Sequence, residues 1–147
     1  MRIAFGCDHA AFKIKGGVIE YLKKQGHAVD DFGCASAESC DYPDFGIPAA
    51  RSVAEGRNDK GVLICGTGIG MSILANKVPG IRAGVAWEEE VAKCASEHNN
   101  ANVLCLPARF SSLDKIISCI DTWLKTPFSG ESRHQKRIDK IMELEKR

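Results

Sequence analysis

The sequence lacks any long apolar run. Its apolar segments are short, and none approaches the roughly 18 residues that a membrane-spanning helix needs. In the N-terminal segment MRIAFGCDHA, the apolar run meets Asp8 and His9 before it is long enough for the core of a signal peptide. We therefore expect a cytoplasmic protein that has no membrane partner.

A marked excess of one charge is also missing. The chain has 20 basic and 19 acidic residues and a formal net charge of +1. Proteins that hold nucleic acid or anionic membranes through their overall field carry a large basic excess. The sequence therefore predicts no nucleic-acid partner, and any site for an anion must be local.

The cysteines do not form a recognisable pairing pattern. There are seven of them, an odd number, and no two are spaced as C-x-x-C. This excludes a disulfide framework and a zinc ribbon as the basis of the fold. Cys7, Cys105 and Cys119 lie in apolar runs and are expected to be reduced core residues, because a buried cysteine behaves as a small hydrophobe. Cys65 could be a core residue as well.

Strand and helix patterns alternate along the chain. With 147 residues, of which 44% are hydrophobic, the chain is expected to form one domain over residues 1–147. Strand-like segments occur at residues 2–7, 28–33, 61–65, 82–87 and 102–107, and helical patterns follow at residues 11–25, after Ser72, from Glu88 and after Arg109. We predict a Rossmann-like α/β fold, in which a five-stranded parallel sheet is covered by helices on both faces as a three-layer sandwich.

Local signals mark the ends of the helices. Gly26 should end the first helix, and Ser111 with Asp114 resembles the capping box of the helix after Arg109. Beyond Gly130 the chain predicts an extra charged helix with a thin apolar stripe: Ile138, Ile141 and Met142. This helix could lie across a partner subunit or pack on its own domain.

Polar residues follow several of the predicted strands. In open α/β sheets, ligands bind at the carboxyl ends of the strands. The residues found there are Asp8, His9, Asp41, Tyr42, Cys65, the glycine loop after Cys65, and Arg109. We expect them to meet on one rim of the sheet.

The glycine loop, CGTGIGMS over residues 65–72, differs from the familiar phosphate-binding loops. Met71 stands where a dinucleotide fingerprint has its third glycine and where a thiolate phosphatase has its arginine, and the Gly-Lys-Ser/Thr of Walker A is absent. What remains is a row of backbone N–H groups that suits an anion or a developing oxyanion. A helix N-terminus favours the thiolate form of a cysteine. Cys65 could therefore be a base that removes a proton beside a carbonyl, or an inert core residue.

Two further groups of polar residues lie in the second half of the chain. His98 and Asn99 end the helix that begins at Glu88, and His98 could equally be a structural residue on its inner face. Arg133 and Arg137 share one helical face, with His134 nearby. Two guanidinium groups at this spacing suit a phosphate, although a solvated run of charges would look the same.

These motifs together resemble one family, the type B ribose-5-phosphate isomerases, which also include the galactose-6-phosphate isomerase subunits. The resemblance covers nearly the whole chain, through IAFGCDHAAFKIK, DYPDF, GVLICGTGIGMSILANKVPGIRA, EHNNANVLCLPAR and SGESRHQKRI. It implies the interconversion of ribose 5-phosphate and ribulose 5-phosphate by ring opening and proton transfer between C1 and C2 through an enediolate. It implies no metal or organic cofactor. It also implies homodimers or tetramers whose active sites take residues from both subunits.

The resemblance also implies a role for each candidate residue. Cys65 would be the base, since Met71 occupies the place of the glutamate base of the other branch. The remaining roles are enediolate stabilisation by Thr67 and the loop Gly66, Gly68, Ile69 and Gly70, ring opening by Asp8 and His98, binding of sugar hydroxyls by Tyr42 and Asn99, phosphate binding by His9, Arg109, Arg133 and Arg137, and assistance from His134.

Some alternatives stay open. Pro107 stands where the family more often has glycine, and its fixed φ could aim Arg109 differently. The same chemistry on a six-carbon substrate, such as allose 6-phosphate or galactose 6-phosphate, would leave no obvious mark in the sequence. A binding module for sugar phosphates or nucleotides without catalysis is a third reading, because fold does not fix function.

Overall fold

The computed structural model describes residues 1–146 and contains one five-stranded sheet. The strands are β1 (Arg2–Cys7), β2 (Ala28–Asp31), β3 (Lys60–Cys65), β4 (Ala83–Val85) and β5 (Val103–Pro107). Every pair is parallel, and the strand order is β2-β1-β3-β5-β4. The predicted α/β fold with a parallel sheet is therefore confirmed.

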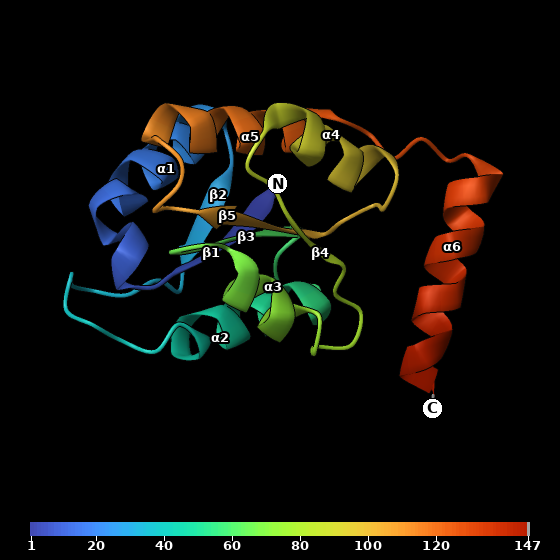
Figure 1. Ribbon diagram of the computed structural model, residues 1–147, viewed down its shortest axis with the longest axis horizontal. Helices are drawn as coiled ribbons and strands as arrows, with labels where there is room; N and C mark the ends of the chain where they lie inside the picture. Colours follow the sequence, from blue (N-terminus) through green and yellow to red (C-terminus); the bar gives the residue numbers. More distant parts are fainter. Residues whose placement is uncertain (147) are drawn as a thin grey trace.

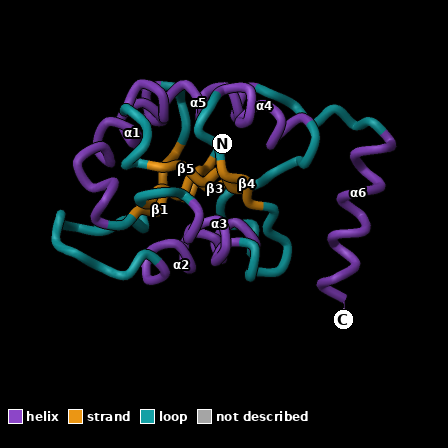
Figure 2. The backbone as a smooth tube through the Cα atoms, in the orientation of Figure 1, coloured by secondary structure: helices purple, strands orange, loops and turns teal. Residues whose placement is uncertain are grey.

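Helices cover both faces of this sheet. They are α1 (Phe12–Lys24), α2 (Pro43–Ala54), α3 (Ile69–Ala75), α4 (Glu89–Glu97), α5 (Leu113–Lys125) and α6 (Ser132–Met142), with short 3₁₀ turns at His9–Ala11 and Glu143–Lys146. Figure 1 shows α1, α4 and α5 on one face, and α2 and α3 on the other. Helix α6 stands beside the three layers, and the tube in Figure 2 follows the connection that leads to it from α5. None of the helices within residues 1–146 is long and apolar enough to cross a membrane.

Successive side chains of each inner strand are buried alternately on the two faces of the sheet. In β1, Ile3, Phe5 and Cys7 belong to the core cluster that includes residues of α1, α4 and α5, whereas Ala4 belongs to the cluster that includes α2 and α3. In β3, Ile64 and Cys65 divide in the same way. Successive side chains of a strand point to opposite faces, so Cys65 is directed toward the layer of α2 and α3.

The end of α1 and the start of α5 test the capping signals predicted from the sequence. Gly26 has a φ of +82°, and its N–H donates to the carbonyl oxygen of Lys23 at 3.0 Å, so α1 ends as predicted. The prediction for α5 was wrong by one residue. Ser112 rather than Ser111 caps this helix, because its extended backbone lets the hydroxyl oxygen accept the N–H of Lys115 at 3.2 Å.

The structure differs from the predicted elements in two other respects. Helix α2 was not among them, although Pro43 stands in its first turn, where proline is favoured; Pro48 inside it weakens the helical signal. The strands β2 and β4 are shorter than predicted. Both are edge strands with one hydrogen-bonded neighbour, so their outer ends have less pairing to hold them extended.

Helix α6 packs on its own chain beside β4. Ile138 is 6% exposed, the Met142 sulfur lies 3.8 Å from Nη1 of Arg82, and the Glu145 carboxylate accepts the Gly80 N–H at 2.9 and 3.0 Å. Ile141 nevertheless remains 53% exposed. The thin apolar stripe is thus partly used within the chain and partly left open.

Candidate active site

A pocket of about 250 Å³ lies at the carboxyl ends of β1 and β3. The chain passes from β1 outward to β2 and then returns to place β3 on the other side of β1, which makes this edge the topological switch point where open α/β sheets bind ligands. The residues that line the pocket are Asp8, His9, Cys40, Asp41, Tyr42, Cys65, Gly66, Thr67, Gly70 and Arg109.

Cys65 is the last residue of β3 and stands at the base of the glycine loop. Its side chain is 4% exposed, and its sulfur accepts the backbone N–H of Gly68 at 3.2 Å. A hydrogen bond from a backbone N–H stabilises a charged acceptor more than a neutral one. The position therefore suits a sulfur that carries negative charge while it faces a small polar pocket.

The glycines of the loop let the backbone of Leu106 and the ring of Tyr42 approach it closely. Gly68 has a φ of +75°, and a Cβ there would lie 3.1–3.3 Å from the backbone of Leu106. A Cβ on Gly70 would lie 2.6 Å from the Tyr42 ring. Thr67 accepts the N–H of Ile69 through its hydroxyl oxygen at 3.2 Å. Its hydroxyl proton is thus left to donate to a ligand.

We expect Gly68→Ala to lower the free energy of unfolding by about 1–2 kcal/mol, the cost of placing a side chain in the left-handed region. Gly16→Ala is the matched control, because Gly16 lies in α1 with nothing within 4 Å of its Cβ position. That change should instead raise the free energy of unfolding by about 0.5–1 kcal/mol. Urea titrations of both variants measure their free energies of unfolding. Equal values would contradict the conclusion that Gly68 is needed for its left-handed backbone conformation.

Asp8 and His9 follow β1 into the pocket. Asp8 is 6% exposed, and its carboxylate accepts the N–H of Ala10 at 3.0 Å. Nδ1 of His9 accepts the backbone N–H of Cys40 at 3.2 Å. Because that nitrogen is an acceptor, neutral His9 carries its proton on Nε2. The loop around Cys40 therefore sets the tautomer of His9.

Arg109 reaches the pocket despite Pro107. Pro107 ends β5 opposite Cys65, and the N–H of Ala108 still donates to the Cys65 carbonyl oxygen at 2.9 Å. The Arg109 guanidinium carbon lies 3.3 Å from where a Cβ of Gly66 would be, so this side chain covers the start of the loop.

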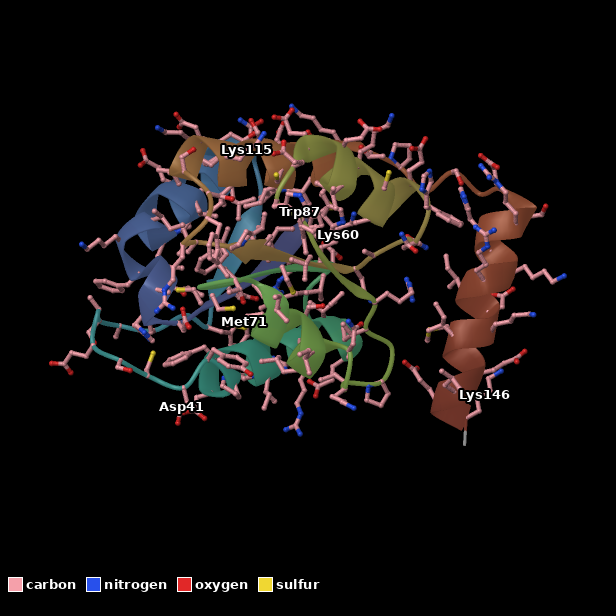
Figure 3. The ribbon with its side chains drawn as sticks, in the orientation of Figure 1. Asp41, Lys60, Met71, Trp87, Lys115 and Lys146 are labelled. Atoms are coloured by element: carbon pink, nitrogen blue, oxygen red, sulfur yellow. The ribbon has the colours of Figure 1, made fainter. Side chains whose placement is uncertain are left out.

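Met71 is turned away from the pocket. It is fully buried, and its sulfur lies 2.6 Å from the Cβ position of Gly46 in α2. Figure 3 shows Met71 on α3, and Asp41 at the end of the loop that leads into α2. An apolar, buried side chain at this place offers no base, so within the pocket the thiol of Cys65 is the group that stands next to the loop N–H groups.

The remaining predicted site residues form a second group away from the pocket. His98 ends α4, which runs back toward the amino ends of the strands, and the neighbouring carbonyl oxygen of Asn100 accepts Nη2 of Arg82 at 2.8 Å. The five residues of β5, at about 3.3 Å each, separate the two edges by roughly 15 Å. Within residues 1–146, none of these side chains lines the pocket: His98, Asn99, Arg133, His134 and Arg137. One chain therefore does not bring the whole predicted set together.

In this second group the two histidines pack together, whereas Arg133 and Arg137 are exposed, and Nε of Arg133 donates to the Glu131 carboxylate at 2.6 Å. The rings of His98 and His134 lie 4.5 Å apart, and Ser129 Oγ lies 2.9 Å from Nδ1 of His134, which is 4% exposed. Burial, and then the charge of Arg133, lowers the pKa of His134 below its usual range. Such a group of nitrogen donors suits an anion.

The lowered pKa of His134 predicts a pH dependence of stability. The folded protein binds the proton of the His134 imidazole more weakly than the unfolded chain does. The folded state is therefore fully stable above the unfolded pKa of about 6.5, and it loses stability as pH falls toward the lower pKa of folded His134. The melting temperature should therefore drop between about pH 7 and pH 5, and His134→Gln should drop less. His27 also has a lowered pKa, so only the difference between the two proteins tests His134; identical pH profiles would contradict it.

Cys40 and Asp41 line the pocket, although the sequence predicted no role for either of them. Asp41 is one of the residues expected on the rim of the sheet, and Cys40 directly precedes it. The sequence signal that could have indicated both residues is their position next to Tyr42, on a loop that follows a strand. The sulfur of Cys40 is 3.7 Å from Nδ1 of His9, a contact that joins segments 31 residues apart and that no local pattern predicts.

The fold and the pocket define a class of protein: a doubly wound α/β protein with a cysteine beside a glycine loop at the switch point of its sheet. The chain belongs to the ribose/galactose isomerase family, which matches residues 3–141. It is 42% identical to ribose-5-phosphate isomerase B of Escherichia coli over 146 residues, which cover 99% of this chain and 97% of that protein.

Solved structures give the same result. Ribose-5-phosphate isomerase B of Clostridium thermocellum has a TM-score of 0.96 at 49% identity, and the match covers 99% of this chain and 98% of that one. The enzyme of Mycoplasma genitalium, solved with bound ribulose 5-phosphate, has a TM-score of 0.94 at 41% identity and covers 99% and 96%. The predicted family and fold are confirmed.

Proposed function

We propose that this protein is an aldose–ketose isomerase that interconverts ribose 5-phosphate and ribulose 5-phosphate, acting as one catalytic domain over residues 1–147, of which Arg147 lies outside the described residues. The observation that carries the proposal is the Cys65 sulfur, which accepts the Gly68 N–H at the mouth of the switch-point pocket. Likeness to ribose-5-phosphate isomerases B supports the substrate.

In this mechanism Cys65 moves the proton. After Asp8 and His98 have opened the sugar ring, the thiolate takes the proton from C2, and the electrons move onto the oxygen at C1 to form the enediolate. The same thiol then returns the proton to C1, while the hydroxyl proton at O2 passes to O1. The N–H groups of the loop 66–70 and the Thr67 hydroxyl stabilise the negative oxygen, which is where donors lower the barrier most.

The substrate is held at both of its ends. His9 and Arg109 line the pocket and would bind the phosphate, and Tyr42, whose ring lies against Gly70, would bind a sugar hydroxyl. The second group adds two guanidinium groups for the phosphate and Asn99 for another hydroxyl. Arginine pairs with phosphate through two parallel hydrogen bonds, and His134 would assist them.

Because the two groups lie at opposite edges of the sheet, we propose that a complete site forms between two copies of the chain. In a homodimer, or a tetramer built from such dimers, the pocket of one copy would be completed by His98 and α6 of the other. Large apolar side chains exposed around the pocket support this arrangement: Ile69 at 56%, Ile73 at 58% and Phe110 at 75%. Two-fold symmetry makes both sites equivalent.

The test of the function is an assay with the purified chain and no added metal. Ribose 5-phosphate in deuterated water should give ribulose 5-phosphate, with exchange of solvent deuterium into the transferred position. Allose 6-phosphate and galactose 6-phosphate are the comparison substrates, and their kcat/KM should be lower. Binding without exchange would indicate a binding module and refute the proposal, and a higher kcat/KM on a six-carbon sugar would refute the substrate.

Arg137→Ala should raise KM for ribose 5-phosphate by about ten- to a hundredfold, the scale of one lost hydrogen bond to a charged group. The effect on kcat should be smaller, because the guanidinium lies far from the proton transfer. Lys136→Ala is the control, since it removes a neighbouring positive charge from the same exposed helix. Equal KM values for the two variants would show that only the general charge of α6 matters.

A further inference from the structure

The loop between β2 and α2 carries a cysteine at each end. Cys34 is 3% exposed, whereas Cys40 is half-buried and lines the pocket. Residues 35–39 between them are all exposed. The proposed mechanism uses neither thiol, although this loop touches the site.

Contacts hold both ends of this loop against the end of β1 and the residues that follow it. The N–H of Cys34 donates to the carbonyl oxygen of Cys7 at 3.0 Å. At the other end, both the backbone N–H and the sulfur of Cys40 face Nδ1 of His9, at 3.2 and 3.7 Å. Cys7 and Cys34 belong to one core cluster, and Cys40 packs against that cluster. The Cys34 thiol lies close enough to the other two to raise their pKa values.

We propose that Cys34 and Cys40 form a reversible disulfide when a hydroperoxide reaches the pocket. The thiolate of Cys40 attacks the peroxide, the O–O bond breaks, and Cys40 becomes a sulfenic acid while an alcohol or water leaves. The thiolate of Cys34 then attacks that sulfur, and the S–O bond breaks with loss of water. In total, two thiols and one hydroperoxide give one disulfide, one alcohol or water, and a second water.

Accessibility selects Cys40 as the first thiol to react. Cys7 is fully buried, whereas Cys40 opens to the pocket. Burial raises the pKa of Cys40, so the reaction is slower than that of an activated thiolate. The exposed residues 35–39 can move to bring the sulfurs to bonding distance without disturbing the core.

The consequence follows from the hydrogen bond between Cys40 and His9. A disulfide to Cys34 moves Cys40 away from Nδ1 of His9 and frees the imidazole from its fixed tautomer and direction. Tyr42, two residues beyond Cys40, is displaced with it. Oxidation should therefore weaken the binding of the sugar phosphate. This consequence rests on the proposed function, whereas the disulfide itself does not.

Peptide mapping tests the disulfide directly. The tryptic peptide Gln25–Arg51 contains Cys34 and Cys40 but no other cysteine and no internal Lys or Arg. The protein carries Cys65→Ala, so that oxidation of the proposed base does not interfere. After treatment with hydrogen peroxide and alkylation in denaturant, this peptide should be unalkylated and lighter by two hydrogens, and dithiothreitol should restore both thiols.

Matched variants complete the mapping. Cys34→Ser and Cys40→Ser should each abolish the disulfide, whereas Cys94→Ser, which changes another half-buried cysteine, should leave it intact. Two alkylated thiols after peroxide treatment would overturn the proposal. A peptide in which Cys34 is joined to Cys7 would overturn the choice of Cys40.

Calorimetry with ribose 5-phosphate tests the consequence in the same Cys65→Ala protein. The oxidised form should bind at least about tenfold more weakly, the scale of one lost charge-assisted hydrogen bond, and dithiothreitol should restore the affinity. Unchanged affinity after oxidation would overturn the consequence. If the reduced protein binds no ribose 5-phosphate, the proposed function fails, and the peptide map still decides whether the disulfide forms.

Discussion

Cys65→Ala is expected to lower kcat for ribose 5-phosphate by roughly three orders of magnitude, within the range that a general base contributes. The variant loses the group that carries the proton between C2 and C1, while the loop N–H groups and the phosphate-binding side chains remain. Exchange of solvent deuterium into the product should fall with kcat. The dissociation constant of ribose 5-phosphate, measured by calorimetry, should change little.

Cys105→Ala is the matched control for this prediction. Cys105 lies in β5, belongs to the same core cluster as Cys65 and is fully buried, where burial raises its pKa far above the usual range. Its removal should lower the melting temperature but leave kcat nearly unchanged. If Cys65→Ala keeps its activity, or if both variants lose the same activity, Cys65 is a core residue and the base lies elsewhere.

Mixing two inactive variants should restore about a quarter of the wild-type activity. When Cys65→Ala and His98→Asn chains are produced together in equal amounts, about half of the dimers contain one chain of each kind. In such a dimer, one site combines both defects, and the other takes an intact pocket from the His98→Asn chain and an intact His98 from the Cys65→Ala chain. The assay is conversion of ribose 5-phosphate by the co-purified proteins.

The control for mixing pairs Cys65→Ala with Asp8→Asn. Both residues line the same pocket of one chain, so neither site of a mixed dimer is intact, and no activity should return. Failure of the first mixture to recover activity would show that His98 acts within its own chain or not at all. Recovery by the second mixture would contradict the assignment of Asp8 and Cys65 to one pocket.

The sequence allowed the pocket to be located because ligands bind at the carboxyl ends of the strands in open α/β sheets. The residues that follow β1, β3 and β5 could be read from the chain, and the structure places Asp8, Cys65 and Arg109 around one pocket. The rule did not reach Cys40, whose place depends on how an irregular loop folds back on His9. It also offered no means of placing His98, since a histidine that ends a helix can face either the core or a partner.

What the sequence determined by itself is local: short apolar runs indicated the strands, helical periodicity indicated most of the helices, and glycines marked where the backbone turns or comes close to another segment. Strand order and helix direction were decided only in the tertiary structure, because they depend on contacts between residues far apart in the chain. Those contacts place Cys65 at the carboxyl end of β3, whereas His98 ends α4 and lies near the amino end of β5. They also bring Cys34 and Cys40 to the same core cluster, because a folded loop, and not a spacing in the sequence, carries both residues there.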